Sequence, residues 1–566
     1  MAVAAFLRLF NLGLGDPLGD ESLLAFRALG MMDFDEAEFQ TTPLEWFDPA
    51  IPKWTKLSFH DHPLGIFVAQ NISMRIFGET PWAFRLPTAL FGIFSVLLVY
   101  LIGKHLFGEK SGLLSAAILA LTVNHIFISR VGLQESQLLF FMLLSIYCFL
   151  KSKEKDFYFI LMGIALGLAV MTKYTGFILV PIFISHLSLF RREVFLKSQL
   201  YIGALAALII FSPSIIYNLK LYQAVGHFDF QFSYIFGQNP EVWKVAPGKA
   251  EAGDLMYRIA NFIPNLFNSS SWVFISLFIL AFVFVLINLV KTDNKFQHKE
   301  QNSGFREHRL RRSRKPLFCS ENIIFLILAL IFIFILISFV GPATRFLTMF
   351  TPFMALIFGG AISMLGETRF SRKEMLMMIP VILFLGFELF YSLNSQVIKY
   401  PMGKKFWTYS NLRYENYGWG YNELSDFFKK ELSSKIPAVS FTPKYRFIEK
   451  IQERFLGAPK LAGHAPYYGL IIFDDNIDNI GKLWTLDRLQ IYHSWPVIKA
   501  DSYFALPNKE VFENKYFVIP KDKTPLKKKG LTLSGRMLED ELKTKGIQPI
   551  VIRNSKSDEA FYIYHF

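Results

Sequence analysis

The stretch Leu7-Arg-Leu-Phe-Asn-Leu-Gly-Leu-Gly-Asp-Pro-Leu-Gly-Asp-Glu-Ser22 joins an apolar segment to an acidic pair, Asp20 and Glu21. The chain that follows repeatedly contains apolar runs long enough to cross the roughly 30 Å of hydrocarbon in a bilayer. Two carboxylates just outside a membrane helix suggest chemistry at the lipid surface. The Asp20-Glu21 loop is therefore the first candidate for a functional site.

The composition is that of a polytopic membrane protein. Of the 566 residues, 52% are hydrophobic and 61 are phenylalanine, which is more than one soluble core can bury. The apolar runs that predict membrane helices are residues 86–103, 112–128, 136–150, 157–172, 174–190, 199–217, 272–290, 321–340, 346–366 and 375–393. The N-terminal stretch has no small-residue cleavage site, so we count it as a retained first helix, which makes about eleven.

The distribution of the net charge of +14 predicts the topology. Lysine and arginine cluster in every second loop, at residues 104–110, 151–155, 191–197, 291–315 and 369–373. By the positive-inside rule these loops are cytoplasmic, the N-terminus is inside and the C-terminal region is outside. The densest basic run, residues 306–315, has the charge to contact nucleic acid or anionic lipid in principle. A topology-setting cytoplasmic loop explains it better, so no nucleic-acid partner is expected.

Two regions follow from this topology. Residues 1–395 form a membrane domain with outer loops at 15–81 and 218–271 and a basic cytoplasmic loop at 291–320. Hydropathy then drops, and residues 396–566 predict a soluble α/β domain with strands near 469–473, 516–519 and 561–564. The sequence contains no glycine-rich phosphate loop, which argues against an ATP-driven pump.

Several motifs carry a resemblance to a known family. Besides the Asp20-Glu21 loop they are Ala83-Phe-Arg-Leu-Pro-Thr-Ala-Leu-Phe-Gly92, Ser129-Arg-Val-Gly-Leu-Gln-Glu-Ser136, Gly167-Leu-Ala-Val-Met-Thr-Lys-Tyr-Thr-Gly176 and Thr344-Arg-Phe-Leu-Thr-Met-Phe-Thr-Pro352. In this order they resemble polyprenyl-phosphate-dependent glycosyltransferases of the type C fold. That group includes protein O-mannosyltransferases and aminoarabinose transferases. The resemblance implies a multi-pass protein of the bacterial or archaeal inner membrane that acts in cell-envelope glycosylation.

The resemblance also implies roles for acidic residues. A sugar on a lipid phosphate already has a good leaving group, so the enzyme mainly needs a base for the acceptor hydroxyl and cations for the departing phosphate. Asp20 matches the catalytic carboxylate of the family, and Glu21 would orient that loop or the acceptor. Glu135 stands where relatives place a second acid, usually aspartate. The alternative for Asp20 and Glu21 is a simple helix cap before Ser22.

The cations expected at the lipid phosphate are Arg345, Lys173, Arg85 and His62. For Arg85 and Lys173, an interface anchor is an equal alternative. His60 and His62, with Glu21, also invite a divalent-metal site, because some relatives bind such an ion. Adjacent histidines diverge on a helix, so the sequence favours no metal.

The sequence thus predicts an inverting glycosyltransferase that moves a sugar from a polyprenyl-phosphate donor to a lipid, glycan or protein acceptor on the outer face of the membrane. The alternative is a polytopic transporter or flippase, which would normally carry broken or polar segments near mid-membrane. A scaffold with a decayed catalytic loop is a third possibility, which the retention of Asp20, Glu135 and Arg345 argues against.

Overall fold

The computed structural model describes most of the membrane domain and of the C-terminal domain. The described residues are 1–30, 63–238, 253–302, 320–366, 371–398, 402–412, 418–435, 467–521 and 530–566, apart from positions 18, 404, 434, 478 and 494.

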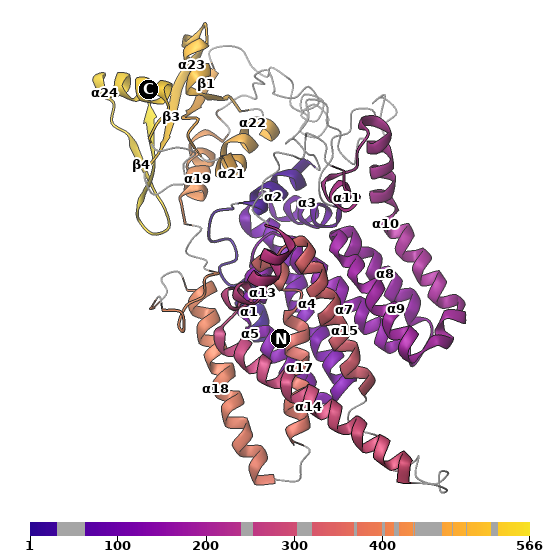
Figure 1. Ribbon diagram of the computed structural model, residues 1–566. Helices are drawn as coiled ribbons and strands as arrows, with labels where there is room; N and C mark the ends of the chain where they lie inside the picture. Colours follow the sequence, from indigo (N-terminus) through magenta and orange to yellow (C-terminus); the bar gives the residue numbers. More distant parts are fainter. Residues whose placement is uncertain are drawn as a thin grey trace.

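The apolar runs predicted from the sequence lie on helices. These and the shorter helices between them are α1 (Ala2–Leu9), α2 (Asp20–Gly30), α3 (Gly65–Phe77), α4 (Pro81–Phe107), α5 (Glu109–Leu121), α6 (Val123–Arg130), α7 (Glu135–Lys151), α8 (Tyr158–Thr172), η3 (Tyr174–Ile178), α9 (Leu179–Phe190), η4 (Arg192–Leu196), α10 (Ser198–Val225), α11 (Phe230–Ile235), α13 (Leu255–Ser269), α14 (Trp272–Asn302), α15 (Ser320–Val340), α16 (Thr344–Leu347), α17 (Thr351–Gly366) and α18 (Ser371–Gln396). They form the elongated bundle in Figure 1.

Not every predicted span is long enough to cross a bilayer as one straight helix. Within the described residues, five helices are long and apolar enough, and α5 with α6 makes a sixth if this pair, bent by 60°, is one span. The helices α8 and α9 are apolar but shorter. The structure therefore supports a multi-pass helical bundle, and the number of eleven crossings stays a prediction.

The basic loops meet at one end of the bundle. Lys153, in the loop after α7, pairs with Glu321 of α15 at 2.7 Å, and Lys197, before α10, pairs with Asp156 at 2.6 Å. These ion pairs join loops that are distant in sequence. The predicted cytoplasmic loops 151–155 and 191–197 consequently lie together, as alternation along the chain requires.

The C-terminal region contains a five-stranded sheet in the order β2-β1-β3-β5-β4. Its strands are β1 (Tyr467–Phe473), β2 (Val497–Lys499), β3 (Phe512–Pro520), β4 (Ile550–Arg553) and β5 (Glu559–His565). The strand β1 is parallel to β2 and β3, whereas β5 is antiparallel to β3 and β4. The three strands predicted from the sequence fall within β1, β3 and β5, and the two short edge strands were not predicted.

Helices cover both faces of this sheet. The helices and short turns of the domain are α19 (Tyr421–Leu432), α21 (Asn479–Lys482), η7 (Leu483–Asp487), α22 (Arg488–His493), α23 (Ala500–Ala505), η8 (Lys509–Val511) and α24 (Leu533–Thr544). Side chains of β1 alternate between two cores, with Ile471 packed towards α19 and α22 and Ile472 towards α23 and α24. Burial on both faces explains why β1 and β3 are almost continuously apolar.

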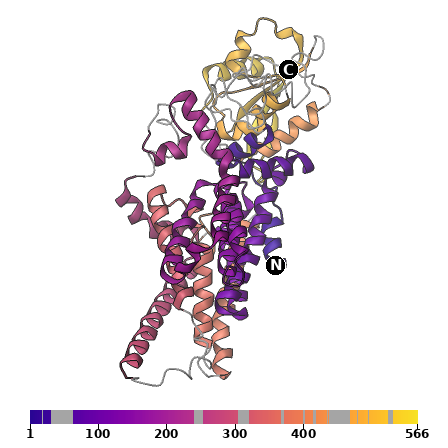
Figure 2. The ribbon, with the colours of Figure 1, turned by 90° about the vertical axis from the view of Figure 1, so that its right-hand side faces the viewer.

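The C-terminal domain sits on one end of the helical bundle, beside α2 and α3 (Figures 1 and 2). Asp16, buried in the loop before α2, accepts hydrogen bonds from the backbone N–H groups of Gly420 (2.9 Å) and Asn422 (2.7 Å). A carboxylate at a helix N-terminus satisfies free N–H groups and interacts favourably with the helix dipole. A residue of the membrane domain therefore caps α19 of the C-terminal domain.

A second polar contact joins the two regions at Glu79, just before α4. Its carboxylate lies 3.2 Å from Nη1 of the buried Arg488 and 2.8 Å from Nε2 of His493, and its carbonyl accepts a bond from Lys429. Burial alone would raise the pKa of Glu79. The hydrogen bond with His493 and the charges of Arg488 and Lys429 outweigh that effect and lower the pKa below its ordinary value of 4.5.

We expect Glu79→Gln to weaken this contact by about 2 kcal/mol at pH 7, because a buried guanidinium loses its charged partner. Since the folded pKa lies below 4.5, the stabilisation is complete above about pH 4.5 and disappears as the pH falls through the folded value. Thermal unfolding midpoints from pH 7 to 3 check this. The gap between parent and variant should shrink below pH 4.5, and a constant gap would contradict the account.

Candidate active site

Four of the site residues predicted from separate motifs come together at the end of the bundle that faces the C-terminal domain. Asp20 is the first residue of α2, Glu135 is the first residue of α7, Lys173 follows α8, and Arg345 lies in α16. The helices α7 and α8 follow each other in the chain, but Glu135 and Lys173 are 38 residues apart, at the start of α7 and after the end of α8. Their convergence is therefore a property of the fold and not of local chain geometry.

The four side chains form a row of alternating charge. Nη1 of Arg345 donates a hydrogen bond to Oδ2 of Asp20, and its Nε lies 3.7 Å from Oε1 of Glu135. The same Glu135 oxygen accepts a 2.8 Å hydrogen bond from Nζ of Lys173. The aromatic ring of Phe346 lies beneath both cations, with its centroid 4.2 Å from Nζ of Lys173 and 5.0 Å from Cζ of Arg345.

Exposure divides the row, which we call the charge row, into two halves. The side chains of Glu135 and Lys173 are only 3% and 5% exposed, so each needs the other's charge to offset the loss of water. Those of Asp20 and Arg345 are 52% and 32% exposed. A ligand can therefore reach the outer half directly, while the inner half is an enclosed ion pair behind it.

Neighbouring helices hold the turn that carries Arg345. The amide of Asn124 in α6 donates to the carbonyl of Thr344 at 3.0 Å, and Asn265 of α13 donates to the carbonyl of Pro342 at 3.1 Å. Gly341 opens the turn with a φ of +110°, a conformation that side-chain-bearing residues rarely adopt. Sequence reasoning missed Asn124, although a lone amide in the apolar run 112–128 was a signal.

Glu21 and Arg85 form a separate buried pair beside the charge row. Nε and Nη2 of Arg85 donate to the two carboxylate oxygens of Glu21 at 2.6 and 2.9 Å, and Nη1 donates to the carbonyl of Leu14 at 2.7 Å. The backbone N–H of Gly132 donates to Oε1 of Glu21 at 2.6 Å. This pair fastens the start of α2 to α4 and to the turn after α6. Arg85 thus faces the protein's own carboxylate and carbonyls, and this geometry gives no support to its predicted contact with donor phosphate.

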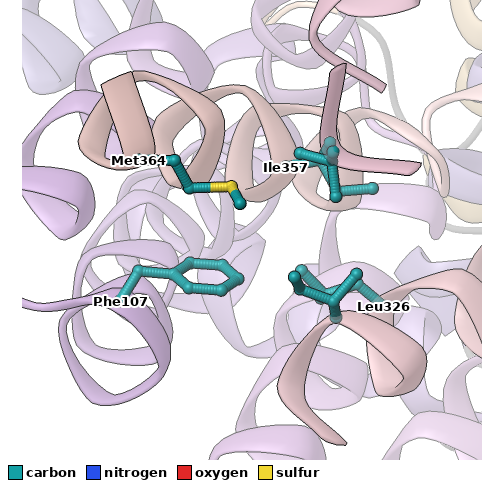
Figure 3. A pocket seen from close by; sticks show the side chains of 7 residues that line it. Phe107, Leu326, Ile357 and Met364 are labelled. Carbon is teal, nitrogen blue, oxygen red and sulfur yellow. The ribbon is translucent and has the colours of Figure 1, made fainter. Parts of the chain in front are cut away.

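The structure does not test the other predicted residues. His60 and His62 fall outside the described residues. Within the part of the chain that is described, no group of three His, Cys, Asp or Glu side chains can hold a metal ion. An apolar cavity lined by side chains that include Phe107, Leu326, Ile357 and Met364 is shown in Figure 3. With about 10 Å³ for a water-sized occupant and no polar lining, it is not a substrate site.

Comparison with known proteins finds a family model and several relatives that are named as glycosyltransferases. Residues 61–217 match the family described as dolichyl-phosphate-mannose-protein mannosyltransferase. Bacillus subtilis protein YkcB, named a putative mannosyltransferase, is 29% identical over 168 residues, which are 28% of this chain and 23% of the relative. Proteus mirabilis undecaprenyl phosphate-alpha-4-amino-4-deoxy-L-arabinose arabinosyl transferase 2 is 22% identical over 194 residues, 33% of this chain and 35% of the relative. The chain therefore spans about a quarter of the length of the first of these relatives.

The fold gives a longer match. The crystal structure of ArnT from Cupriavidus metallidurans bound to undecaprenyl phosphate aligns with 100% of this chain and 96% of its own, with a TM-score of 0.51 and 13% sequence identity. Identity at this level shows a shared fold and does not by itself assign an activity. The resemblance to type C polyprenyl-phosphate-dependent glycosyltransferases is confirmed, by sequence over residues 61–217 and by fold over the whole chain.

Proposed function

We propose that this protein is an inverting glycosyltransferase that moves a sugar from a polyprenyl phosphate to a lipid, glycan or protein acceptor at the outer face of the membrane. The observation that carries the proposal is the charge row, in which a half-exposed carboxylate, Asp20, lies beside a half-exposed guanidinium, Arg345. Transfer from a lipid phosphate requires that combination of a base and a phosphate-binding cation.

The reaction is a single displacement. Asp20 takes the proton of the acceptor hydroxyl while the acceptor's hydroxyl oxygen attacks the anomeric carbon of the donor. The bond between that carbon and the phosphate oxygen breaks, and its electron pair leaves with the polyprenyl phosphate. Attack opposite the leaving group inverts the anomeric centre. Arg345 stabilises the charge that develops on the phosphate, because its fork of N–H donors can bind phosphate oxygens and the Asp20 carboxylate together.

The inner half of the charge row has a different task. Lys173 supplies a second positive charge behind Arg345, and Glu135 bridges the two cations and keeps them from repelling each other. We therefore assign Glu135 to positioning these cations, with Arg345 in contact with the donor phosphate and Lys173 adding positive charge from behind it. We do not assign Arg85 to the donor phosphate, because its guanidinium is paired with the carboxylate of Glu21. These steps are assigned to side chains alone. His62 stays a candidate phosphate residue, and His60, His62 and Glu21 stay candidates for a divalent-metal site.

We further propose a topology of about eleven membrane helices, with the N-terminus in the cytoplasm and residues 396–566 outside, in a bacterial or archaeal inner membrane. Two observations support it. The basic loops gather at one end of the bundle, and the charge row and the C-terminal domain lie at the other. Asp20, in the predicted outer loop 15–81, then faces the outer side of the membrane.

Cysteine labelling checks this topology. In a background without Cys148 and Cys319, the test introduces cysteine at two exposed positions, as Lys110→Cys in a predicted cytoplasmic loop and Lys556→Cys in the C-terminal domain. In intact cells, an impermeant maleimide should label position 556 and reach position 110 only after the membrane is opened. Labelling of both positions from the same side would overturn the topology and with it the outer placement of the site.

The function itself is tested with purified protein and a panel of polyprenyl-phosphate sugars, mixed with membrane extract as the acceptor source. We expect mass spectrometry to detect release of free polyprenyl phosphate from one of the donors in the panel. If the protein is instead a flippase, the donor stays intact and only changes leaflet in reconstituted vesicles. Leaflet exchange without any free polyprenyl phosphate would therefore replace the proposed function by the transport alternative.

A further inference from the structure

The C-terminal domain contributes a side chain to the core beneath α2. Trp484, in the π-helical turn η7, is 1% exposed and packs in one cluster with Leu24 and Ala28 of α2 and with Phe84 of α4. Its ring meets that of Phe84 edge to face, with centroids 5.0 Å apart. This cluster is separate from the core between the sheet and its own helices, so Trp484 belongs to the packing of the membrane domain.

Arg488 fixes the position of Trp484. Its guanidinium lies 4.5 Å from the centroid of the Trp484 ring and is fully buried. It donates 3.1 Å hydrogen bonds to the carbonyl of Glu79 and to Oγ of Ser425. A buried guanidinium with these partners cannot shift without leaving charged or polar groups unpaired.

Tyr492 holds the other end of α2. Its hydroxyl donates a 2.7 Å hydrogen bond to the carbonyl of Phe26, and the rings of Phe26 and Tyr492 lie 4.9 Å apart. A Cβ atom added at Gly30, the last residue of α2, would lie 2.5 Å from the Tyr492 ring. Any larger residue at position 30 would collide with Tyr492, so α2 and the C-terminal domain are in close contact here.

These contacts lead to the charge row through a short series of neighbours. Phe84, which meets Trp484, precedes Arg85, and Arg85 grips Glu21 at the start of α2. Glu21 is adjacent to Asp20 in the same helical turn. The end of α2 thus contacts the C-terminal domain directly through Tyr492, while its start is held by Arg85, the neighbour of the residue that meets Trp484. A tilt of α2 would move the Asp20 carboxylate.

We propose that the C-terminal domain holds α2 in place, with Trp484, Arg488 and Tyr492 as positioning residues that keep Asp20 beside Arg345. This proposal rests on the proposed function for its catalytic consequence. It gives the domain a part in the chemical step in addition to any contact with the acceptor. A displacement of about 1 Å at a reacting group can cost about a hundredfold in rate, so contacts this distant from the donor are able to control turnover.

Three variants of the full-length protein test it. Trp484→Ala removes the contact, Trp484→Phe keeps an aromatic ring, and Phe517→Leu is a control in the core on the far face of the sheet, which does not touch α2. Hydrogen exchange of the α2 amides is the first measurement. We expect at least about tenfold faster exchange in Trp484→Ala, partial restoration in Trp484→Phe and the parental rate in Phe517→Leu.

Steady-state kinetics is the second measurement. Trp484→Ala should lower kcat by about tenfold or more and leave the donor KM within about twofold, because Asp20 acts in the transition state and does not hold the donor. Parental exchange in α2 would overturn the proposal, as would a parental kcat despite faster exchange. If the parent transfers no sugar, the proposed function fails, while the exchange rates still decide whether the domain holds α2.

Discussion

Asp20→Asn should lower turnover by about a hundredfold or more while leaving expression and donor binding close to parental values. The substitution keeps the size and one oxygen of the side chain but removes the group that accepts the acceptor's proton. Because Asp20 is half exposed and outside the packed cores, the change leaves the fold intact. Initial rates of polyprenyl phosphate release, measured at saturating donor, check the prediction.

The matched control is Asp501→Asn, the same change at an exposed aspartate of the C-terminal domain, which should keep the parental rate. If Asp20→Asn also transfers sugar at that rate, then Asp20 is only an acidic residue in the first turn of α2 and another group is the base. Glu135 is a poor substitute, since it is enclosed between Lys173 and Arg345.

Arg345→Ala should abolish most of the activity, and Arg345→Lys should retain part of it. A guanidinium binds phosphate oxygens through two parallel N–H groups, whereas an ammonium offers a point charge. We expect the first effect of both substitutions to be weaker binding of the donor. At saturating donor, turnover should also fall, by about tenfold or more, because charge on the leaving phosphate grows in the transition state.

Donor titrations of both variants measure these effects separately. Arg536→Ala, which removes an exposed arginine from α24, serves as the control and should bind donor as the parent does. Parental values for Arg345→Ala would make Arg345 an interface anchor. The phosphate site would then have to be sought nearer Lys173 and Phe346, deeper in the same row.

The sequence predicts much of this arrangement, because hydropathy and charge act locally. Apolar runs become helices, and basic loops mark one end of the bundle. Asp20, Glu135, Lys173 and Arg345 each follow or begin a helix at the other end, where polar groups are tolerated. The structure brings these four residues together, while their catalytic roles stay predictions.

The sequence does not show which distant residues pair with each other. Arg85 and Arg345 look alike as cations at helix ends, yet Arg85 is buried against Glu21 while Arg345 is half exposed beside Asp20. The packing of α2 against α4 decides which cation meets which carboxylate. The short strands β2 and β4 were missed for a related reason, because segments of three or four residues have too little periodicity to detect.

The role of Trp484 is also beyond sequence reasoning. A tryptophan with an arginine four residues later is a common helical pattern, and it does not indicate which distant helix the tryptophan contacts. Only the three-dimensional structure shows that Trp484 packs beneath α2 and that Tyr492 lies against Gly30. Long-range packing of this kind is determined by two surfaces that are hundreds of residues apart in the chain.

Product analysis tests the central claim most directly. Purified protein is supplied with the donor that is active in the panel, the polyprenyl phosphate released is quantified, and NMR determines the configuration at the anomeric carbon of the transferred sugar. We predict one polyprenyl phosphate for each sugar transferred, with the configuration inverted, as a single displacement with Asp20 as base requires. A retained configuration would mean that a covalent intermediate forms, and it would contradict the account.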